Sequence, residues 1–364
     1  MKKLSKSLIL SLALFGLIGC SSSTNTETTT SEENPGQEVE SRETINLIAS
    51  THSPPGIPLT RAFDAYLDEI EERSEGQIEF ERYYNGGLSD GFDVIDAVGN
   101  GIADVAVVFP SWQSGKLPLN TIASNPGLHE NAWTAVKALN ELQQQIPEMN
   151  QELENHGNVN IGNFGAPPMY FISTSPLNEF DDLKGLQVLT NSPTQAAIAG
   201  ELGMVPVGMN LTDAYDALTR GIVDTVLFSA QGAMSFGLHE SAKHAWQLPM
   251  GTTTGLYTMN QTVWEGLPAE LQDVITEVKE EFQADSFHTI YQLSEEEYEE
   301  KFIEAGGTIV EPTEEDLSFM IDIITTHVWD EWIKEQEGKG LPGEQVLNTY
   351  RELVEKYEQE NPFK

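Results

Sequence analysis

The chain has 364 residues, 39% of them hydrophobic, and a formal net charge of −39 at pH 7. A negative field of this strength repels phosphate backbones, which excludes a nucleic-acid-binding protein, and it repels anionic lipid as well. The sequence holds one cysteine, so a disulfide framework and a metal site made of cysteines are also excluded.

The N-terminus has the pattern of a secretory signal. Lys2, Lys3 and Lys6 precede an apolar run over residues 8–18, and Gly19 and Cys20 follow it. The run is shorter than the about 20 apolar residues that a membrane-spanning helix needs. We therefore predict a signal peptide over residues 1–19. Residues 17–20 resemble a bacterial lipobox, which implies that Cys20 is acylated and becomes the first residue of the mature protein. The alternative is an ordinary cleaved signal followed by a chance cysteine.

Residues 20–43 are rich in serine, threonine and glutamate and hold almost no apolar residues. Such a segment cannot bury enough surface to offset the entropy of ordering it, which predicts a disordered tether behind the lipidated cysteine. Because the net charge repels lipid, the acyl group is the expected membrane anchor.

From residue 44 onward, strand and helix patterns alternate, which predicts an α/β protein. The first half contains strands over residues 45–49 and 78–80 and a fully buried strand over 105–109. Phe63, Leu67 and Ile70 keep helical spacing before a stop at Gly76, and residues 93–99 form a short second helix.

The second half repeats this alternation. Strands are predicted over residues 187–189 and 222–228, a helix over 193–202, and a further helix capped by Thr212 and ended by Gly221. Helical spacing then continues over residues 268–305, a length on the order of 55 Å. A helix of this length either spans two domains or breaks near Ser294.

The sequence lacks the patterns of enzymes and cofactor sites. It contains no phosphate loop, no Gly-x-Gly-x-x-Gly and no Gly-x-Ser-x-Gly, so neither a nucleotide cofactor nor a hydrolase nucleophile is indicated. His239 and His244 are five residues apart, whereas a zinc helix of the metalloprotease type needs four. We therefore predict no enzyme, no cofactor and no metal site.

Six motifs follow one another along the chain. They are Tyr84-x-Gly-Gly-Leu88, Gly101-x-Ala-Asp104, Asp182-Leu-Lys-Gly-Leu-Gln-Val-Leu-Thr190, Leu202-Gly-x-x-Pro206, Tyr215-x-Ala-Leu-x-x-Gly221-x-Val-Asp224 and Met259-Asn-x-x-x-Trp264-x-x-Leu-Pro268. Each motif alone is weak, but their order and spacing resemble the DctP-type substrate-binding proteins of tripartite ATP-independent periplasmic (TRAP) transporters, here in a lipoprotein form. The resemblance covers residues 44–364.

The resemblance implies a two-lobed periplasmic-binding-protein fold of the α/β class, with crossing hinge strands and a long lobe-bridging helix. The expected lobes are residues 44–167 with 253–293, and 168–252 with 294–364; the expected crossing strands are 169–173 and 255–259. The implied function is an extracytoplasmic solute receptor, in the periplasm or at the cell surface. Its cleft closes over a small organic solute, which small and large membrane permease subunits then take up.

The resemblance also marks ligand-anchoring positions. Arginine usually occupies the position of Leu189, some members carry a second arginine at Met169, and an asparagine often stands at Phe228. Since a carboxylate buried against these apolar groups is unfavourable, we predict a neutral or cationic solute, held in part by cation–π attraction. The full set of predicted ligand-binding residues is His52, Phe109, Trp112, Met169, Leu189, Asn191, Phe228 and Gln231.

Several alternatives stay open. Leu189 and Met169 are core residues if the register is shifted by one, Trp112 fits lobe packing, and His52 fits an ordinary loop. The solute is an organic acid if a different group anchors it. The same fold also serves ligand-presenting sensors, and a secreted hydrolase or a structural surface protein are more distant alternatives.

Overall fold

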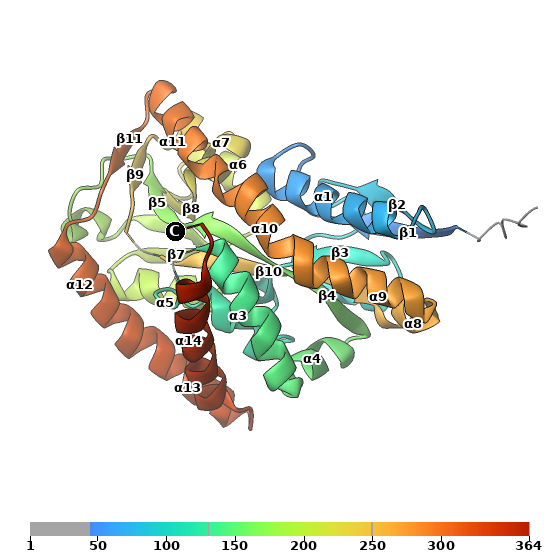
Figure 1. Ribbon diagram of the computed structural model, residues 1–364. Helices are drawn as coiled ribbons and strands as arrows, with labels where there is room; N and C mark the ends of the chain where they lie inside the picture. Colours follow the sequence, from blue (N-terminus) through green and yellow to red (C-terminus); the bar gives the residue numbers. More distant parts are fainter. Residues whose placement is uncertain (1–43, 130, 249, 364) are drawn as a thin grey trace, which may run out of the picture. The chain divides into compact units, whose positions relative to one another are not determined.

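The computed structural model describes residues 44–129, 131–248 and 250–363, so the predicted signal peptide, Cys20 and the tether lie outside the described residues. The described residues form two β-sheets surrounded by helices (Figure 1). Within these ranges, no helix is long and apolar enough to cross a bilayer.

The first sheet has the strand order β2-β1-β3-β10-β4. Its strands are β1 (Ile45–Ser50), β2 (Ile78–Tyr83), β3 (Val105–Val108), β4 (Asn158–Pro168) and β10 (Thr252–Asn260). β1 runs parallel to β2 and β3, and β10 runs antiparallel to β3 and β4. All four residues of β3 are buried, as the continuous apolar run predicts. Helix α1 (Pro58–Arg73) packs Phe63, Leu67 and Ile70 into the core of this sheet.

The second sheet has the strand order β11-β9-β5-β8-β6-β7. Its strands are β5 (Tyr170–Ser173), β6 (Gln187–Thr190), β7 (Val205–Gly208), β8 (Thr225–Phe228), β9 (His244–Trp246) and β11 (Thr308–Val310). β6 is parallel to β7 and β8, whereas β5 is antiparallel to β8 and β9. The mixed α/β architecture of two sheets confirms the predicted fold class.

The remaining helices cover the two sheets. They are α2 (Val94–Gly99), α3 (Ala132–Gln145), α4 (Pro147–Glu154), α5 (Pro193–Glu201), α6 (Ala214–Thr219), α7 (Ala230–Ser235), α8 (Gln261–Gly266), α12 (Glu314–Ile323), α13 (Asp330–Gly338) and α14 (Gly343–Glu360). The predicted cap at Thr212 is wrong. Thr212 lies inside a 3-10 turn, Leu211–Asp213, and α6 starts after that turn without a side-chain cap.

Strand β8 is shorter than predicted, because the chain is still turning at residues 222–224. Ile222 is 46% exposed, and the carboxylate of Asp224 accepts a hydrogen bond from the backbone N–H of Gln187 at 2.9 Å. The Asp224 side chain thus ties the turn to the start of β6, and regular pairing with β6 begins at Thr225.

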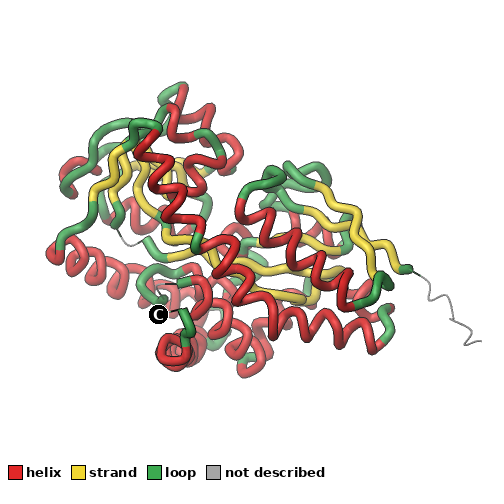
Figure 2. Tube along the Cα trace, turned by 45° about the horizontal axis from the view of Figure 1, so that its top comes forward, coloured by secondary structure: helices red, strands yellow, loops and turns green. Residues whose placement is uncertain are grey.

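The helical stretch predicted over residues 268–305 connects the two sheets (Figure 2). It consists of α9 (Ala269–Glu277), α10 (Gln283–Phe287) and α11 (Ser294–Glu304), with π-helical turns at Val278–Phe282 and His288–Gln292. Leu271 and Ile275 pack in the core of the first sheet, and Phe302 packs in that of the second. The stretch therefore spans both sheets, and its one-residue interruption at Leu293 directly precedes Ser294.

The chain also passes between the sheets at two places. Met169 joins β4 to β5, and Gly251 directly precedes β10 on the second passage, which follows β9. The backbone N–H of Met169 donates to the carbonyl of Gly251 at 3.0 Å, so the two passages touch where they cross. Both predicted crossing strands are corrected by this topology. Residues 255–259 lie wholly in the first sheet, and of residues 169–173 only Met169 lies at the crossing, because residues 170–173 form β5 of the second sheet.

The last helices pack near the first sheet. Val346 and Tyr350 of α14 share a core with Leu139 and Leu142 of α3, and Trp332 of α13 joins the same core. The predicted second lobe includes all of residues 294–364, whereas α13 and α14 pack against α3, a helix of the predicted first lobe. The lobe boundaries stay a prediction.

Candidate functional site

A central cavity lies where the two sheets approach each other, and the space within and around it that holds no protein atoms, open solvent included, is about 640 Å³. Its lining residues are His52, Ser53, Ile57, Leu59, Phe109, Trp112, Ala166, Pro167, Met169, Asn191, Gln195, Leu211, Leu227, Phe228, Ser229, Gln231, Gly232, Phe236 and Tyr291. His52, Phe109, Asn191 and Phe228 stand at or just beyond the carboxyl ends of β1, β3, β6 and β8. Ligands of α/β proteins bind at this end of the strands.

Seven of the eight predicted ligand-binding residues line this cavity: His52, Phe109, Trp112, Met169, Asn191, Phe228 and Gln231. Leu189 does not. It is 2% exposed and packs in the core of the second sheet with Tyr170 and Val226. Because successive side chains point to opposite faces of a strand and both faces of β6 are covered, Leu189 is a core residue in this structure.

The sequence pattern missed other lining residues. Gln195 lies in the first turn of α5, and its Oε1 accepts a hydrogen bond from the backbone N–H of Asn191 at 2.9 Å. The spacing of four residues between Asn191 and Gln195, at the start of a predicted helix, is a signal in the sequence that could have indicated Gln195 as a lining residue. Tyr291 arrives from the long helical stretch, and no local pattern in the sequence connects it to the strand ends.

One wall of the cavity is aromatic. The rings of Phe109 and Trp112 are stacked with centroids 4.8 Å apart, and the His52 ring lies 4.8 Å from that of Trp112. The backbone of Gly91 passes so close to the indole that a Cβ there would overlap it. From the second sheet, Phe228 and Phe236 contribute two more rings, 5.6 Å apart.

The polar groups of the cavity are amides and hydroxyls. Ser229 caps α7 by accepting a hydrogen bond from the backbone N–H of Gly232 at 3.0 Å. The Nε2 of Gln231 donates to Ser235 at 3.0 Å, and the Nε2 of Gln195 lies 3.7 Å from the sulfur of Met169. These groups can orient a solute by hydrogen bonds without supplying a charge.

No lysine or arginine belongs to the described lining of the cavity. His52 is its one imidazole, and burial lowers the pKa of His52 to about 4, so its ring is neutral at pH 7. A carboxylate in the cavity would thus meet no cationic side chain among these residues.

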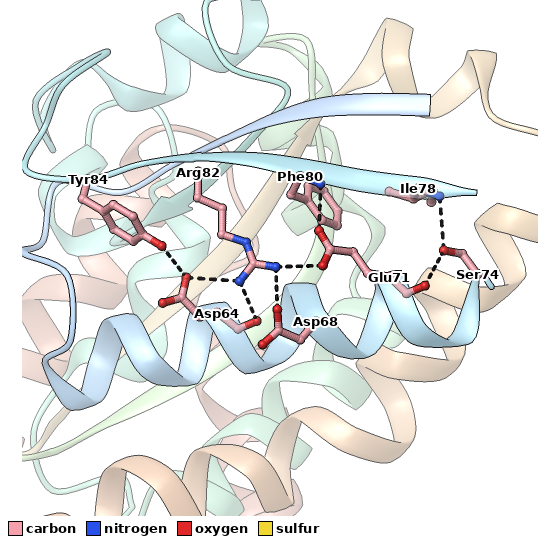
Figure 3. A network of polar contacts seen from close by, with 8 residues as sticks. All are labelled: Asp64, Asp68, Glu71, Ser74, Ile78, Phe80, Arg82 and Tyr84. Carbon is pink, nitrogen blue, oxygen red and sulfur yellow. Dashed lines mark hydrogen bonds and ion pairs between the residues drawn. The ribbon is translucent and has the colours of Figure 1, made fainter. Parts of the chain in front are cut away.

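An organic acid would need a cationic anchor, and Arg82 is one arginine that could serve, but its guanidinium is engaged elsewhere (Figure 3). Its guanidinium contacts the carboxylates of Asp68 at 2.6 Å, Glu71 at 3.0 Å and Asp64 at 3.6 Å, and all three belong to α1. Tyr84 donates a further hydrogen bond to Asp64 at 3.0 Å. The cluster ties β2 to α1 and contributes nothing to the cavity lining.

The predicted absence of a metal site concerns His239 and His244. In the described residues, no group of histidine, cysteine, aspartate and glutamate is arranged to hold a metal ion. The Nδ1 of His244 instead forms a hydrogen bond with the hydroxyl of Thr308 at 2.9 Å.

A family model described as DctP, bacterial extracellular solute-binding protein, family 7, matches residues 49–336. The chain belongs to this family. The match confirms the resemblance predicted from the six motifs. As a DctP protein, the chain is an extracytoplasmic solute receptor of the TRAP type, and it works with membrane permease subunits; the hydrolase alternative finds no support.

Solved structures share this fold. A TRAP solute-binding protein from Rhodoferax ferrireducens T118, in complex with copurified benzoate, superposes with a TM-score of 0.80 at 21% identity, covering 87% of this chain and 99% of the other. DctP7, a Bordetella pertussis receptor binding pyroglutamic acid, gives a TM-score of 0.75 at 20% identity, covering 85% of this chain and 100% of the other. These likenesses confirm the two-lobed fold.

Among curated relatives, a solute-binding protein of Sulfitobacter sp. (strain NAS-14.1) is 25% identical over 61% of this chain and 68% of its own length. The ectoine-binding periplasmic protein TeaA of Halomonas elongata is 25% identical over 66% of this chain and 69% of its own length. The first of these names specifies no solute and the second specifies ectoine, so the family alone does not assign a solute here.

Proposed function

We propose that this DctP receptor captures a neutral or cationic organic solute in the central cavity. His52, Phe109, Trp112, Met169, Asn191, Phe228 and Gln231 are the proposed contacts. The observation that carries the proposal is the lining itself, which is aromatic, amide and hydroxyl in character and lacks a positive charge among the described residues. Burying an unpaired carboxylate there is unfavourable, whereas aromatic faces and amide oxygens suit a neutral or positively charged group.

An organic acid is the second candidate. Structural neighbours are recorded with benzoate and with pyroglutamate, and both are organic acids. In this receptor such a solute would depend on neutral donors, for example the side-chain amides of Asn191 and Gln231.

A thermal-shift screen of the purified receptor tests the two candidates. Panels of amines, betaines, alcohols, sugars and carboxylates are added separately, and a solute at 100 times its dissociation constant adds about 2.7 kcal/mol of stability. We expect shifts with amines or neutral solutes and none with carboxylates. A strong shift with a carboxylate alone would exclude the neutral-or-cationic proposal and leave the receptor function intact.

The receptor is also proposed to be anchored through an acylated Cys20 and to hand its solute to the permease at the membrane. This proposal rests on the lipobox resemblance, since Cys20 lies outside the described residues. We expect the Cys20→Ala variant to move from the membrane fraction to the soluble fraction of the cell envelope, as followed by immunoblot. An unchanged membrane fraction would mean that another anchor holds the protein.

A further inference from the structure

Glu295 is a buried carboxylate directly behind the wall of the cavity. It lies in the first turn of α11 and is 6% exposed. Its Oε1 accepts a hydrogen bond from the backbone N–H of Ala230 at 2.7 Å, and its Oε2 accepts one from that of Gln231 at 3.2 Å. Gln231 itself lines the cavity, as does Tyr291, one helical turn before Glu295. The carboxylate is therefore separated from the solute space by a single layer of residues.

Positioning α7 does not by itself require a charge at this place. Ser229 already caps the helix with a neutral hydroxyl, through the N–H of Gly232. A buried carboxylate is costly, and burial raises the pKa of Glu295 to about 7 in spite of its two hydrogen bonds. The charge of Glu295 is not needed to cap α7, and burial makes that charge unfavourable. We therefore look for a function of Glu295 that depends on its charge.

The groups around Glu295 do not neutralise it. Glu299, one turn later on α11, raises the pKa of Glu295 further, and its carboxylate accepts hydrogen bonds from Tyr170 of β5 at 2.8 Å and from Gln247 at 2.6 Å. Two tyrosines are further titratable neighbours. The Tyr170 hydroxyl also hydrogen-bonds Glu295 and lowers its pKa, without offsetting the effect of burial. Burial, and after it the negative charge of Glu295, raises the pKa of the Tyr291 hydroxyl on the adjoining π-helical turn. Among the described residues, no lysine or arginine forms an ion pair with Glu295 or Glu299.

When Glu295 is ionised, it and Glu299 have no cationic partner and produce a negative field that extends into the cavity. The field is weakly screened there because the walls are largely apolar and aromatic. It favours a positive charge in the cavity, disfavours a negative one and leaves a neutral molecule nearly unaffected. A cation would add cation–π contacts with the aromatic wall.

Resting on the proposed function of the cavity, we propose that Glu295 makes this receptor select cationic solutes over neutral solutes of the same shape, and that a cation expels the proton from Glu295 when it binds. The sign of the pH dependence follows from linkage. Below its pKa, Glu295 is protonated in the free receptor and must lose its proton to favour the cation. Affinity for a cation therefore rises between pH 6 and pH 8, whereas affinity for a neutral solute does not change through this group.

Three planar probes of nearly equal size test the inference: benzamidine, benzamide and benzoate, which are cationic, neutral and anionic at these pH values. Their affinities for the full receptor are measured by calorimetry at pH 6 and pH 8. We expect benzamidine to bind more tightly than benzamide at pH 8 by about tenfold, the effect of one pKa unit of coupling, and to lose most of this advantage at pH 6.

Glu295→Gln keeps the size of the side chain and removes its charge. We expect it to weaken benzamidine about tenfold at pH 8, to leave benzamide unchanged and to abolish the pH dependence. Glu296→Gln, a change at the neighbouring exposed residue, is the matched control. Glu299→Gln is a second variant and should weaken benzamidine to a smaller extent.

Equal losses for benzamidine and benzamide in Glu295→Gln would show that Glu295 only positions α7, and this would overturn the inference. Tightest binding of benzoate would overturn it together with the neutral-or-cationic proposal. Absence of binding by all three probes would also overturn it, while the broad solute screen would still decide on the receptor function separately.

Discussion

Replacement of Glu152 by alanine is expected to lower the free energy of unfolding by about 3–5 kcal/mol at pH 5. It leaves two buried backbone N–H groups without an acceptor, at roughly 1–3 kcal/mol each before relaxation, and it leaves the Nδ2 of Asn120 with the carbonyl of Met149 as its acceptor. Glu152 is 6% exposed. One of its carboxylate oxygens accepts from the backbone N–H of Leu119 at 2.7 Å. The other accepts from the backbone N–H of Asn120 at 3.2 Å and from its Nδ2 at 2.8 Å. Urea unfolding of both proteins measures the loss.

The size of this loss should depend on pH. Burial raises the pKa of Glu152 to about 7, above its ordinary value of 4.5. The folded state therefore holds a proton that the unfolded state has released, and the stability contributed by that proton is lost as pH rises from about 4.5 through 7. The alanine variant lacks this group. The difference in the free energy of unfolding between the wild type and Glu152→Ala should therefore be largest near pH 5 and should decrease toward pH 8.

The matched control is Glu154→Ala, an exposed glutamate at the end of the same helix, α4, which should change stability by no more than about 0.5 kcal/mol. Equal denaturation midpoints for Glu152→Ala and Glu154→Ala would contradict the expectation. They would mean that water or a backbone shift satisfies the exposed donors.

Glu152 matters for the site because it anchors a polar network that extends to β4, the strand that leads to Met169. The Nε2 of Gln143 donates to the Oδ1 of Asn120 at 2.9 Å, and the Nδ2 of Asn163 donates to the Oε1 of Gln143 at 2.7 Å. Asn163 belongs to β4, whose end leads into Met169. The network thus fixes the strand that delivers a lining residue to the cavity.

None of this network could be predicted from the sequence. Asn120, Gln143 and Asn163 are at least twenty residues apart, and a polar side chain in a helix or strand pattern usually indicates a solvent-exposed position. Their burial is decided by tertiary packing of α3 and α4 against β4. Periodicity reports which face of an element is apolar, but it does not report a second buried face that is polar.

Individual helices and strands could be predicted from the sequence more readily than this network. The helices at residues 58–73 and 193–201 and the buried strand at 105–108 follow from periodicity and from their glycine stops, because those signals act within a few residues. The predicted cap at Thr212 failed because a 3-10 turn precedes α6. The crossing beside Gly251 was missed because the contact between Met169 and Gly251 joins residues far apart in the sequence, which local patterns do not report.

The candidate site was predictable where it follows strand ends. His52, Phe109, Asn191 and Phe228 are adjacent to strands whose carboxyl ends meet, so a strand assignment is enough to bring them together. Leu189 does not line the cavity for a related reason. It lies inside a strand that is covered on both faces, so its side chain packs in the core instead. Tyr291 and Glu295 come from the bridging helix, and only its course in three dimensions reveals their position.

Replacement of Trp112 by alanine is expected to weaken binding of the best solute from the screen by about 30-fold or more, in keeping with the 2 kcal/mol or more lost when a central aromatic anchor is truncated. Trp112 lines the central cavity and two neighbouring pockets, one with Phe92 and Thr190 and one with Asn85 and Asp90. Its indole is therefore the partition between the solute space and the wider openings beside it. Calorimetry on both proteins provides the affinities.

Removal of the indole should act in two ways that one further variant separates. The solute loses a ring contact, and the cavity gains water through the neighbouring pockets, which weakens every polar contact inside. Trp112→Phe restores an aromatic ring, but the phenyl group is smaller than the indole and covers less of the openings. Its affinity for the solute should therefore lie between those of the wild type and of Trp112→Ala. A wild-type affinity in Trp112→Ala, with the thermal shift by the solute preserved, would place the solute outside the central cavity and remove the basis for the contacts assigned here.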